Sequence, residues 1–157
     1  MNRKATDGKE LEQYYAKNGN QLIVLYGRKD CKKEELLRSF VQDKKCFYYR
    51  CRQTSPEDQK RMMGEEVSAQ YDVRLAKNSY DEYFNRIKSG DATKLVVIID
   101  EVQYIMKRDP EFLNSILKLK TKRLYPGPVM IMLASSSIVW AEQDLDDAFG
   151  DDSKRID

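Results

Sequence analysis

The sequence contains no histidine and only three cysteines among its 157 residues. The lack of imidazole counts against a catalytic triad or dyad that uses histidine, and against a zinc site of the common kind. The cysteines form no CxxC pair. Cys46 and Cys51 lie five positions apart on an expected strand, so their side chains should point to opposite faces. We therefore interpret the cysteines as reduced thiols of a cytoplasmic chain.

Long apolar runs are also missing. No run approaches the ~18 residues that a membrane span needs. Residues 1–4 are basic but lead into polar sequence, which predicts no signal peptide and no membrane association. The chain has 28 basic and 26 acidic residues, a formal net charge of +2. A charge this close to balance does not by itself call for nucleic acid or an anionic membrane.

Strand-like and helix-like segments alternate along the chain. Short apolar runs typical of buried parallel strands occupy residues 21–26, 95–99 and 129–134, and an aromatic-rich run at residues 45–51 predicts a fourth strand. Helical patterns lie between and around them, in segments at residues 10–17, 34–42, 55–71, 79–88, from 109 onward and 138–149. This alternation predicts an α/β fold with three layers, helices covering both faces of a mainly parallel sheet.

The length suits one domain. We expect residues 1–150 to form that single domain, with residues 151–157 as a polar, disordered tail.

The first candidate site lies between the first strand and the following helix, where a Walker A loop, GxxxxGK[ST], would lie. In such a loop, backbone N–H groups and a lysine bind phosphates, and a Ser/Thr hydroxyl holds Mg²⁺. By spacing, Gly27 takes the place of the first glycine and Lys33 that of the lysine. Lys32 stands in place of the second glycine, and Glu34 in place of the hydroxyl residue.

Both replacements change the chemistry of the loop. The side chain of Lys32 obstructs the close approach of a phosphate. Glu34 introduces a carboxylate that can ligate Mg²⁺ but repels a triphosphate. We predict a degraded phosphate loop in which ATP and Mg²⁺ bind weakly or not at all, formed by Gly27, Arg28, Lys32, Lys33 and Glu34. A basic, solvated connection with an acid at a helix start is the simpler alternative.

The second candidate site follows the most apolar strand, where residues 95–101 read LVVIIDE. Apolar residues that end in Asp-Glu are the Walker B pattern. In that pattern Asp100 would hold the Mg²⁺ shell and Glu101 would polarise the attacking water. The alternative is a core strand followed by two surface acids.

The third candidate is the serine run at residues 135–137. In ATPases with an extra strand between the Walker A and Walker B strands, a polar residue at this place senses the γ-phosphate. Ser135 is the candidate for that role. A serine-rich turn that caps the next helix is the alternative.

Taken together, these segments resemble a known family. The similarity covers residues 10–137 and is carried by the runs QLIVLYGRKDCKKEELLRSF, CFYY, KLVVIIDEVQYIMKRDPEFLNSILK and VMIMLASSS. They resemble the AAA-like ATPase family best known from archaea, a branch of the additional-strand P-loop ATPases. The resemblance implies a P-loop NTPase-like fold with strand order 5-1-4-3-2. Family members typically have Gly-Lys-Thr where this sequence has Lys32, Lys33 and Glu34. The resemblance therefore implies the fold more strongly than ATP binding, and it implies ATP hydrolysis least.

Only four strands are found in the sequence, so we expect the C-terminal part of the family fold to be missing. The lid, the winged-helix region and the nuclease-like domain that usually follow are not found either, and with them an arginine finger is missing. The first strand, Gln21–Tyr26, would then lie at the edge of the sheet. Because an apolar edge strand is prone to pair with other chains, we expect one of two situations. Either the chain is a fragment of a longer protein, or a protein partner or self-association covers this edge.

Three functions compete. The first is a non-hydrolysing scaffold or weak nucleotide sensor. The second is a working ATPase module in which Glu34 joins Asp100 at the metal. The third is a nucleic-acid-binding module, suggested by basic residues within 28–33 and 118–123. For the second basic cluster, a cationic helix end that matches the helix dipole is the simpler account.

Overall fold

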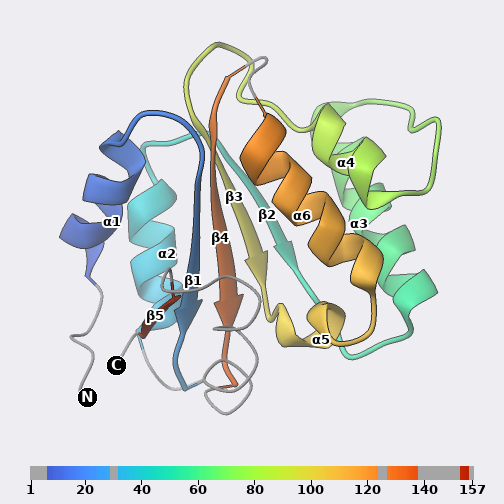
Figure 1. The fold of residues 1–157 in the computed structure, drawn as a ribbon, viewed down its shortest axis with the longest axis horizontal. Helices are drawn as coiled ribbons and strands as arrows, with labels where there is room; N and C mark the ends of the chain where they lie inside the picture. Colours follow the sequence, from blue (N-terminus) through green and yellow to red (C-terminus); the bar gives the residue numbers. More distant parts are fainter. Residues whose placement is uncertain (1–6, 29–31, 124–126, 138–152, 156–157) are drawn as a thin grey trace.

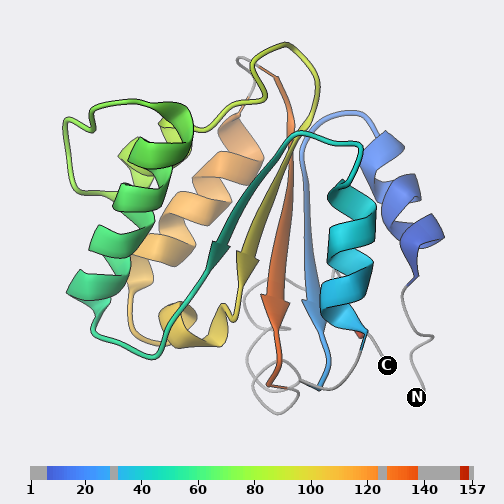
Figure 2. The same cartoon turned by 180° about the vertical axis from the view of Figure 1, so that it is seen from behind.

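A computed structural model of the chain describes residues 7–28, 32–123, 127–137 and 153–155. A parallel sheet lies between two groups of helices (Figures 1 and 2). The strands are β1 (Gln21–Tyr26), β2 (Cys46–Arg50), β3 (Leu95–Asp100), β4 (Val129–Ser135) and β5 (Ser153–Arg155). The helices are α1 (Gly8–Ala16), α2 (Lys33–Val41), α3 (Pro56–Tyr71), α4 (Tyr80–Arg86), α5 (Gln103–Met106) and α6 (Pro110–Lys122). The three-layer α/β prediction is confirmed.

The described strands run in the order β2-β3-β4-β1-β5, and all their pairings are parallel. Read from the other side, this is the order 5-1-4-3-2 that the family resemblance implies. The order places β1, β3 and β4 side by side in the middle of the sheet. All residues of these three strands are buried, which explains their continuous apolar runs.

The fifth strand corrects two predictions. We expected residues 151–157 to be a disordered tail and β1 to lie at a sheet edge. Instead, residues 153–155 of the expected tail form β5, which pairs with residues 24–26 of β1, so that this part of β1 lies between β4 and β5. The other residues of the expected tail lie outside the described ranges. Three polar residues carry no strand pattern of their own, so their conformation depends on pairing with β1. Among the described strands, the terminal position beside β3 belongs to β2.

Two hydrophobic cores cover the two faces of the sheet. One core lies under α1 and α2 and includes Leu11, Leu37 and Phe40. The other lies under α3, α4 and α6 and includes a contacting aromatic group formed by Tyr80, Tyr83, Phe84 and Phe112. The tyrosines of α4 thus serve packing, as the sequence interpretation favoured.

Cys46 and Cys51 lie on opposite faces of the sheet, as expected from their spacing. Cys46 packs against the core under α1 and α2, and Cys51 belongs to the other core. Both are free thiols. Burial raises the pKa of Cys46 to about 12, so this thiol is protonated at neutral pH.

Helix starts follow the predicted capping residues. Ser55 accepts a hydrogen bond from the Asp58 N–H, and Ser79 accepts one from the Glu82 N–H. The single turn α5 was not predicted, because four residues are too few to show a helical period. The helix expected over residues 138–149 lies outside the described residues. None of the helices in the described ranges has the length and apolar character of a membrane span.

Candidate functional site

The three predicted segments meet at one end of the sheet, because parallel neighbouring strands end at the same edge (Figure 1). Backbone hydrogen bonds hold the segments together just beyond the strands. The Gly27 N–H donates to the Ser135 carbonyl at 3.1 Å, and the Val102 N–H donates to the Ala134 carbonyl at 2.9 Å. The loop after β1, the acids at the end of β3 and the serines at the end of β4 therefore form one site.

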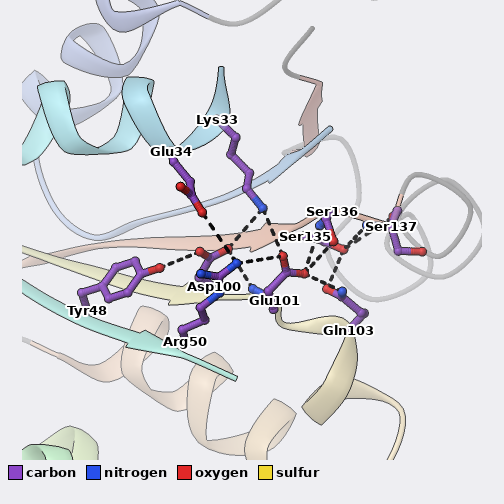
Figure 3. Close-up of polar contacts among 10 residues, drawn as sticks. All are labelled: Lys33, Glu34, Tyr48, Arg50, Asp100, Glu101, Gln103, Ser135, Ser136 and Ser137. Atoms are coloured by element: carbon purple, nitrogen blue, oxygen red, sulfur yellow. Dashed lines mark hydrogen bonds and ion pairs between the residues drawn. The ribbon is translucent and has the colours of Figure 1, made fainter. Parts of the chain in front are cut away.

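The side chain of Lys33 points toward the carboxylates of Asp100 and Glu101 (Figure 3). Its Nζ is 3.2 Å from Oδ1 of Asp100 and 3.7 Å from Oε1 of Glu101. The three residues are 4%, 1% and 5% exposed. A buried charge requires a partner of opposite sign, and here one ammonium group serves two carboxylates. The lysine of the predicted phosphate loop is thus directed into the protein, toward the predicted metal-binding acid.

Both carboxylate oxygens of Asp100 have donors. Oδ1 accepts from the Glu101 N–H at 2.9 Å in addition to Lys33, and Oδ2 accepts from the Tyr48 hydroxyl at 2.6 Å. Tyr48 comes from β2, whose residues lie beside those of β3. Burial, followed by the hydrogen bond to Asp100, raises the pKa of Tyr48, so its hydroxyl remains a donor at neutral pH.

The second carboxylate oxygen of Glu101 accepts hydrogen bonds from two other residues. Its Oε2 accepts from Nε2 of Gln103 at 2.6 Å, from Oγ of Ser136 at 2.8 Å and from the Ser136 N–H at 3.3 Å. Burial alone would raise the pKa of Glu101. The hydrogen bonds from Gln103 and Ser136 and the charge of Lys33 outweigh burial, and the pKa lies below its ordinary value. The carboxylate is therefore ionised and multiply hydrogen-bonded.

The backbone of Glu101 is in the left-handed region, with a φ of 53°. Such a conformation is uncommon for a residue with a side chain and costs on the order of 1 kcal/mol or more. It turns the chain sharply from β3 into α5. The turn places the Asp100 and Glu101 side chains next to one another, with the backbone N–H of Glu101 returning to Asp100.

Ser135 contributes to the site indirectly. Its hydroxyl donates to Oε1 of Gln103 at 2.8 Å and accepts from the Ser137 N–H at 3.0 Å. The residue that contacts Glu101 directly is its neighbour, Ser136. The sequence reasoning missed Ser136, Gln103 and Tyr48. The serine run could have indicated Ser136, whereas no motif indicates the other two.

Three other residues of the predicted loop are exposed to solvent, whereas Gly27 is buried. Arg28, Lys32 and Glu34 are exposed, and residues 29–31 lie outside the described ranges. Lys32 is the N-cap of α2, with a φ of −81° and no side-chain capping bond. The position of the second glycine is thus outside the left-handed region. Oε1 of Glu34 lies 3.6 Å from Nη2 of Arg50, which is also 3.9 Å from Oε1 of Glu101.

The second basic cluster, at the end of α6, is partly engaged within the domain. Nζ of Lys118 lies 3.0 Å from Oδ2 of Asp81 on α4. Arg123 is buried and donates to the carbonyls of Gly127 and Phe84. These contacts join α6 to neighbouring segments and leave fewer cations for an external ligand.

The strand order, the lysine at the start of α2 and the Asp-Glu pair at the end of β3 together define a P-loop NTPase-like α/β domain. A family model described as an ATPase domain predominantly from Archaea matches residues 2–147. The chain belongs to this family.

The chain spans less than half of the length of the curated relative and of the two solved structures described next. An uncharacterized protein of Methanocaldococcus jannaschii is 24% identical over 130 residues, which is 83% of this chain and 28% of that protein. The ORC1 protein of Aeropyrum pernix, solved in complex with DNA, is 17% identical with a TM-score of 0.65, over 96% of this chain and 44% of its own. A Walker-type ATPase of Pyrococcus abyssi is 17% identical with a TM-score of 0.55, over 82% of this chain and 43% of its own. The two structures share the fold.

The family implies ATP and Mg²⁺, and the residues of this site fit them only in part. Lys33 and Asp100 have the side chains that a phosphate and a metal require. The glycine and the hydroxyl residue of the loop are replaced by Lys32 and Glu34, and the Asp100 oxygens already accept from protein donors. Within the described ranges, no group of three or more His, Cys, Asp or Glu side chains could form a separate metal centre.

Proposed function

We propose that this chain is an ATPase-family domain with a degraded phosphate loop, which acts as a non-hydrolysing or weakly nucleotide-binding scaffold or regulatory domain. The contact between Lys33 and the two acids carries the proposal. Through this contact the ammonium group of Lys33 and the carboxylates of Asp100 and Glu101 all have partners within the protein.

Weak nucleotide binding follows from the contacts that would be exchanged. A phosphate would have to take Lys33 from Asp100 and Glu101, and a hydrated metal would have to displace donors from Asp100. The bound phosphate and metal would also gain fewer new contacts, because the loop lacks the second glycine and the metal-holding hydroxyl. Each hydrogen bond that is not replaced costs about 0.5–1.5 kcal/mol, and more for charged groups.

Weak or absent hydrolysis follows from the surroundings of Glu101. Its Oε2 accepts three hydrogen bonds, and its Oε1 faces the cations of Lys33 and Arg50. A carboxylate in this state has little remaining capacity to accept a hydrogen bond from an attacking water. Its lowered pKa also makes it a weaker general base.

A working ATPase is the second candidate. One observation favours it, namely that Lys33, Asp100 and Glu101 are all present and lie together. In that function Lys33 would leave the acids on nucleotide binding, and Glu34 would turn from Arg50 to join Asp100 at the metal.

ATP turnover separates the two candidates. We would measure phosphate release by the unaltered chain, by Asp100→Asn and by Glu35→Gln, an exposed control on α2. The proposal predicts release at background level in all three. Turnover that is present in the unaltered chain and the control but lost in Asp100→Asn would establish the working ATPase instead.

A further inference from the structure

The outer side of β2 carries backbone groups that face away from the sheet. The Cys51 N–H donates to the Asp100 carbonyl at 2.8 Å, and the Val96 N–H donates to the Lys45 carbonyl at 3.0 Å. In a parallel pair, the N–H and C=O of one residue point to the same side, and successive residues alternate. Cys46, Tyr48 and Arg50 therefore direct their backbone groups outward. β2 is the terminal strand of the described sheet.

Two hollows flank this edge and share Tyr48 and Arg50 in their walls. The first, of about 350 Å³, lies beside α2 and is lined by Leu37, Val41, Cys46 and Ile98, with Glu34, Arg38 and Asp100 also in its wall. The second, of about 560 Å³, lies between β2 and α3 and is lined by Tyr49, Met62 and Ala69, with Arg52, Glu65 and Glu66. Tyr48 is one of the two large hydrophobic residues described as exposed, at 41%.

We propose that the edge of β2 binds an extended segment of a protein partner as an additional strand, with acidic and apolar residues in alternation. Side chains of an added strand point alternately to the two faces of the sheet, so successive residues would reach the two hollows in turn. This proposal does not rest on the proposed function of the phosphate loop.

The charges at the edge select the partner. Arg38 and Arg50, on the α2 side, and Arg52, at the end of β2, are all exposed. The described contacts of Arg50 with Glu34 and Glu101 are both long, at 3.6 Å and 3.9 Å. Acidic residues of the partner would meet Arg38 and Arg50 on the α2 side, and apolar residues would meet Tyr49 and Met62 on the α3 side. A second copy of the chain suits the edge poorly, because a two-fold pairing brings the same arginines together.

The first test uses a blocked eight-residue peptide in which glutamate and valine alternate, titrated into the isotope-labelled chain and followed by NMR. We expect saturable shifts at β2 and in the lining of the hollows, with a dissociation constant below about 1 mM. A matched lysine–valine peptide should bind about tenfold more weakly or worse. The proposal is overturned if the glutamate peptide does not bind, if both peptides bind equally, or if the shifts lie elsewhere.

The second test separates strand pairing from simple charge attraction. Two versions of the glutamate peptide carry N-methyl groups on alternate residues, one version on the odd and one on the even positions. Strand addition needs only one set of N–H groups, so one version should lose about tenfold or more in affinity while the other is retained. Equal affinities of the two versions would contradict backbone pairing.

Protein variants complete the design. Arg50→Ala should weaken the glutamate peptide several-fold, whereas Arg61→Ala, an exposed arginine of α3 outside both hollows, should leave its affinity unchanged. Equal losses in the two variants would contradict the proposed surface. Shifts at β2 that appear on raising the protein concentration without peptide would identify a second copy as the occupant and would also overturn the proposal.

Discussion

At the scale of single residues, the charge of Lys33 governs the candidate site. The lysine and both acids are almost fully buried, and they lie at the start of α2 and the end of β3. A buried ion pair contributes little net stability compared with apolar residues of similar shape. Removing one partner is different, because it leaves the other charge buried without compensation.

We therefore predict that Lys33→Met lowers the free energy of unfolding by about 3–5 kcal/mol. Lys32→Met, at the neighbouring exposed position, should change it by no more than about 0.5 kcal/mol. Adding Asp100→Leu to Lys33→Met should recover part of the loss, because it removes one of the stranded acids. Urea unfolding of the four proteins gives these values. A Lys33→Met variant as stable as Lys32→Met would show that the pair is not needed.

Sequence reasoning reached these charged residues because their positions follow from the ends of elements. A lysine at a helix start after β1 and two acids after β3 must lie near one another in a parallel sheet. Tyr48, Gln103 and Ser136 could not be reached in this way. Their contacts depend on the left-handed turn at Glu101 and on side-chain directions that no spacing encodes.

At the scale of elements, the contact between α3 and α4 depends on a glycine. A Cβ atom added to Gly64 of α3 would lie 2.5 Å from the hydroxyl oxygen of Tyr83 on α4. Both residues are buried. The absence of a side chain at Gly64 therefore lets the two helices approach over the aromatic core.

Gly64→Ala should destabilise the domain by about 1–3 kcal/mol, because overpacking outweighs the roughly 1 kcal/mol gained from alanine's helix propensity. Removing the hydroxyl in the double variant Gly64→Ala/Tyr83→Phe should restore part of the loss. Thermal unfolding gives the comparison, with Gln70→Ala as an exposed control on the same helix. If Gly64→Ala raises the melting temperature, the close packing described here is wrong.

Element predictions succeeded where the apolar pattern was long. The strands β1, β3 and β4 read as continuous apolar runs, and α3 and α6 begin at recognisable caps. The short elements α5 and β5 were missed. Four residues do not complete a period, and the strand character of β5 comes from its partner and not from its own residues.

At the scale of the whole molecule, β5 covers part of one edge of the sheet. It pairs with residues 24–26 of β1, a strand whose residues are all buried. The partner or self-association that we expected at Gln21–Tyr26 rested on an open edge there. Because β5 pairs with residues 24–26, we propose that association through this part of β1 requires a chain from which β5 has been removed.

Deletion of residues 153–157 should therefore lower the stability of the domain and promote self-association through β1. Sedimentation over a range of concentrations measures this, with deletion of residues 156–157 alone as the control. A truncated chain that remains monomeric and as stable as the control would show that β5 does not protect this edge.

The most direct test of the central claim is a calorimetric titration of the chain with ATP in the presence of Mg²⁺. The internal pairing of Lys33 and the replacements at Lys32 and Glu34 predict a dissociation constant weaker than roughly 100 μM, about −5.5 kcal/mol. A low-micromolar constant would contradict the account, because it would show that the loop binds the triphosphate despite these residues.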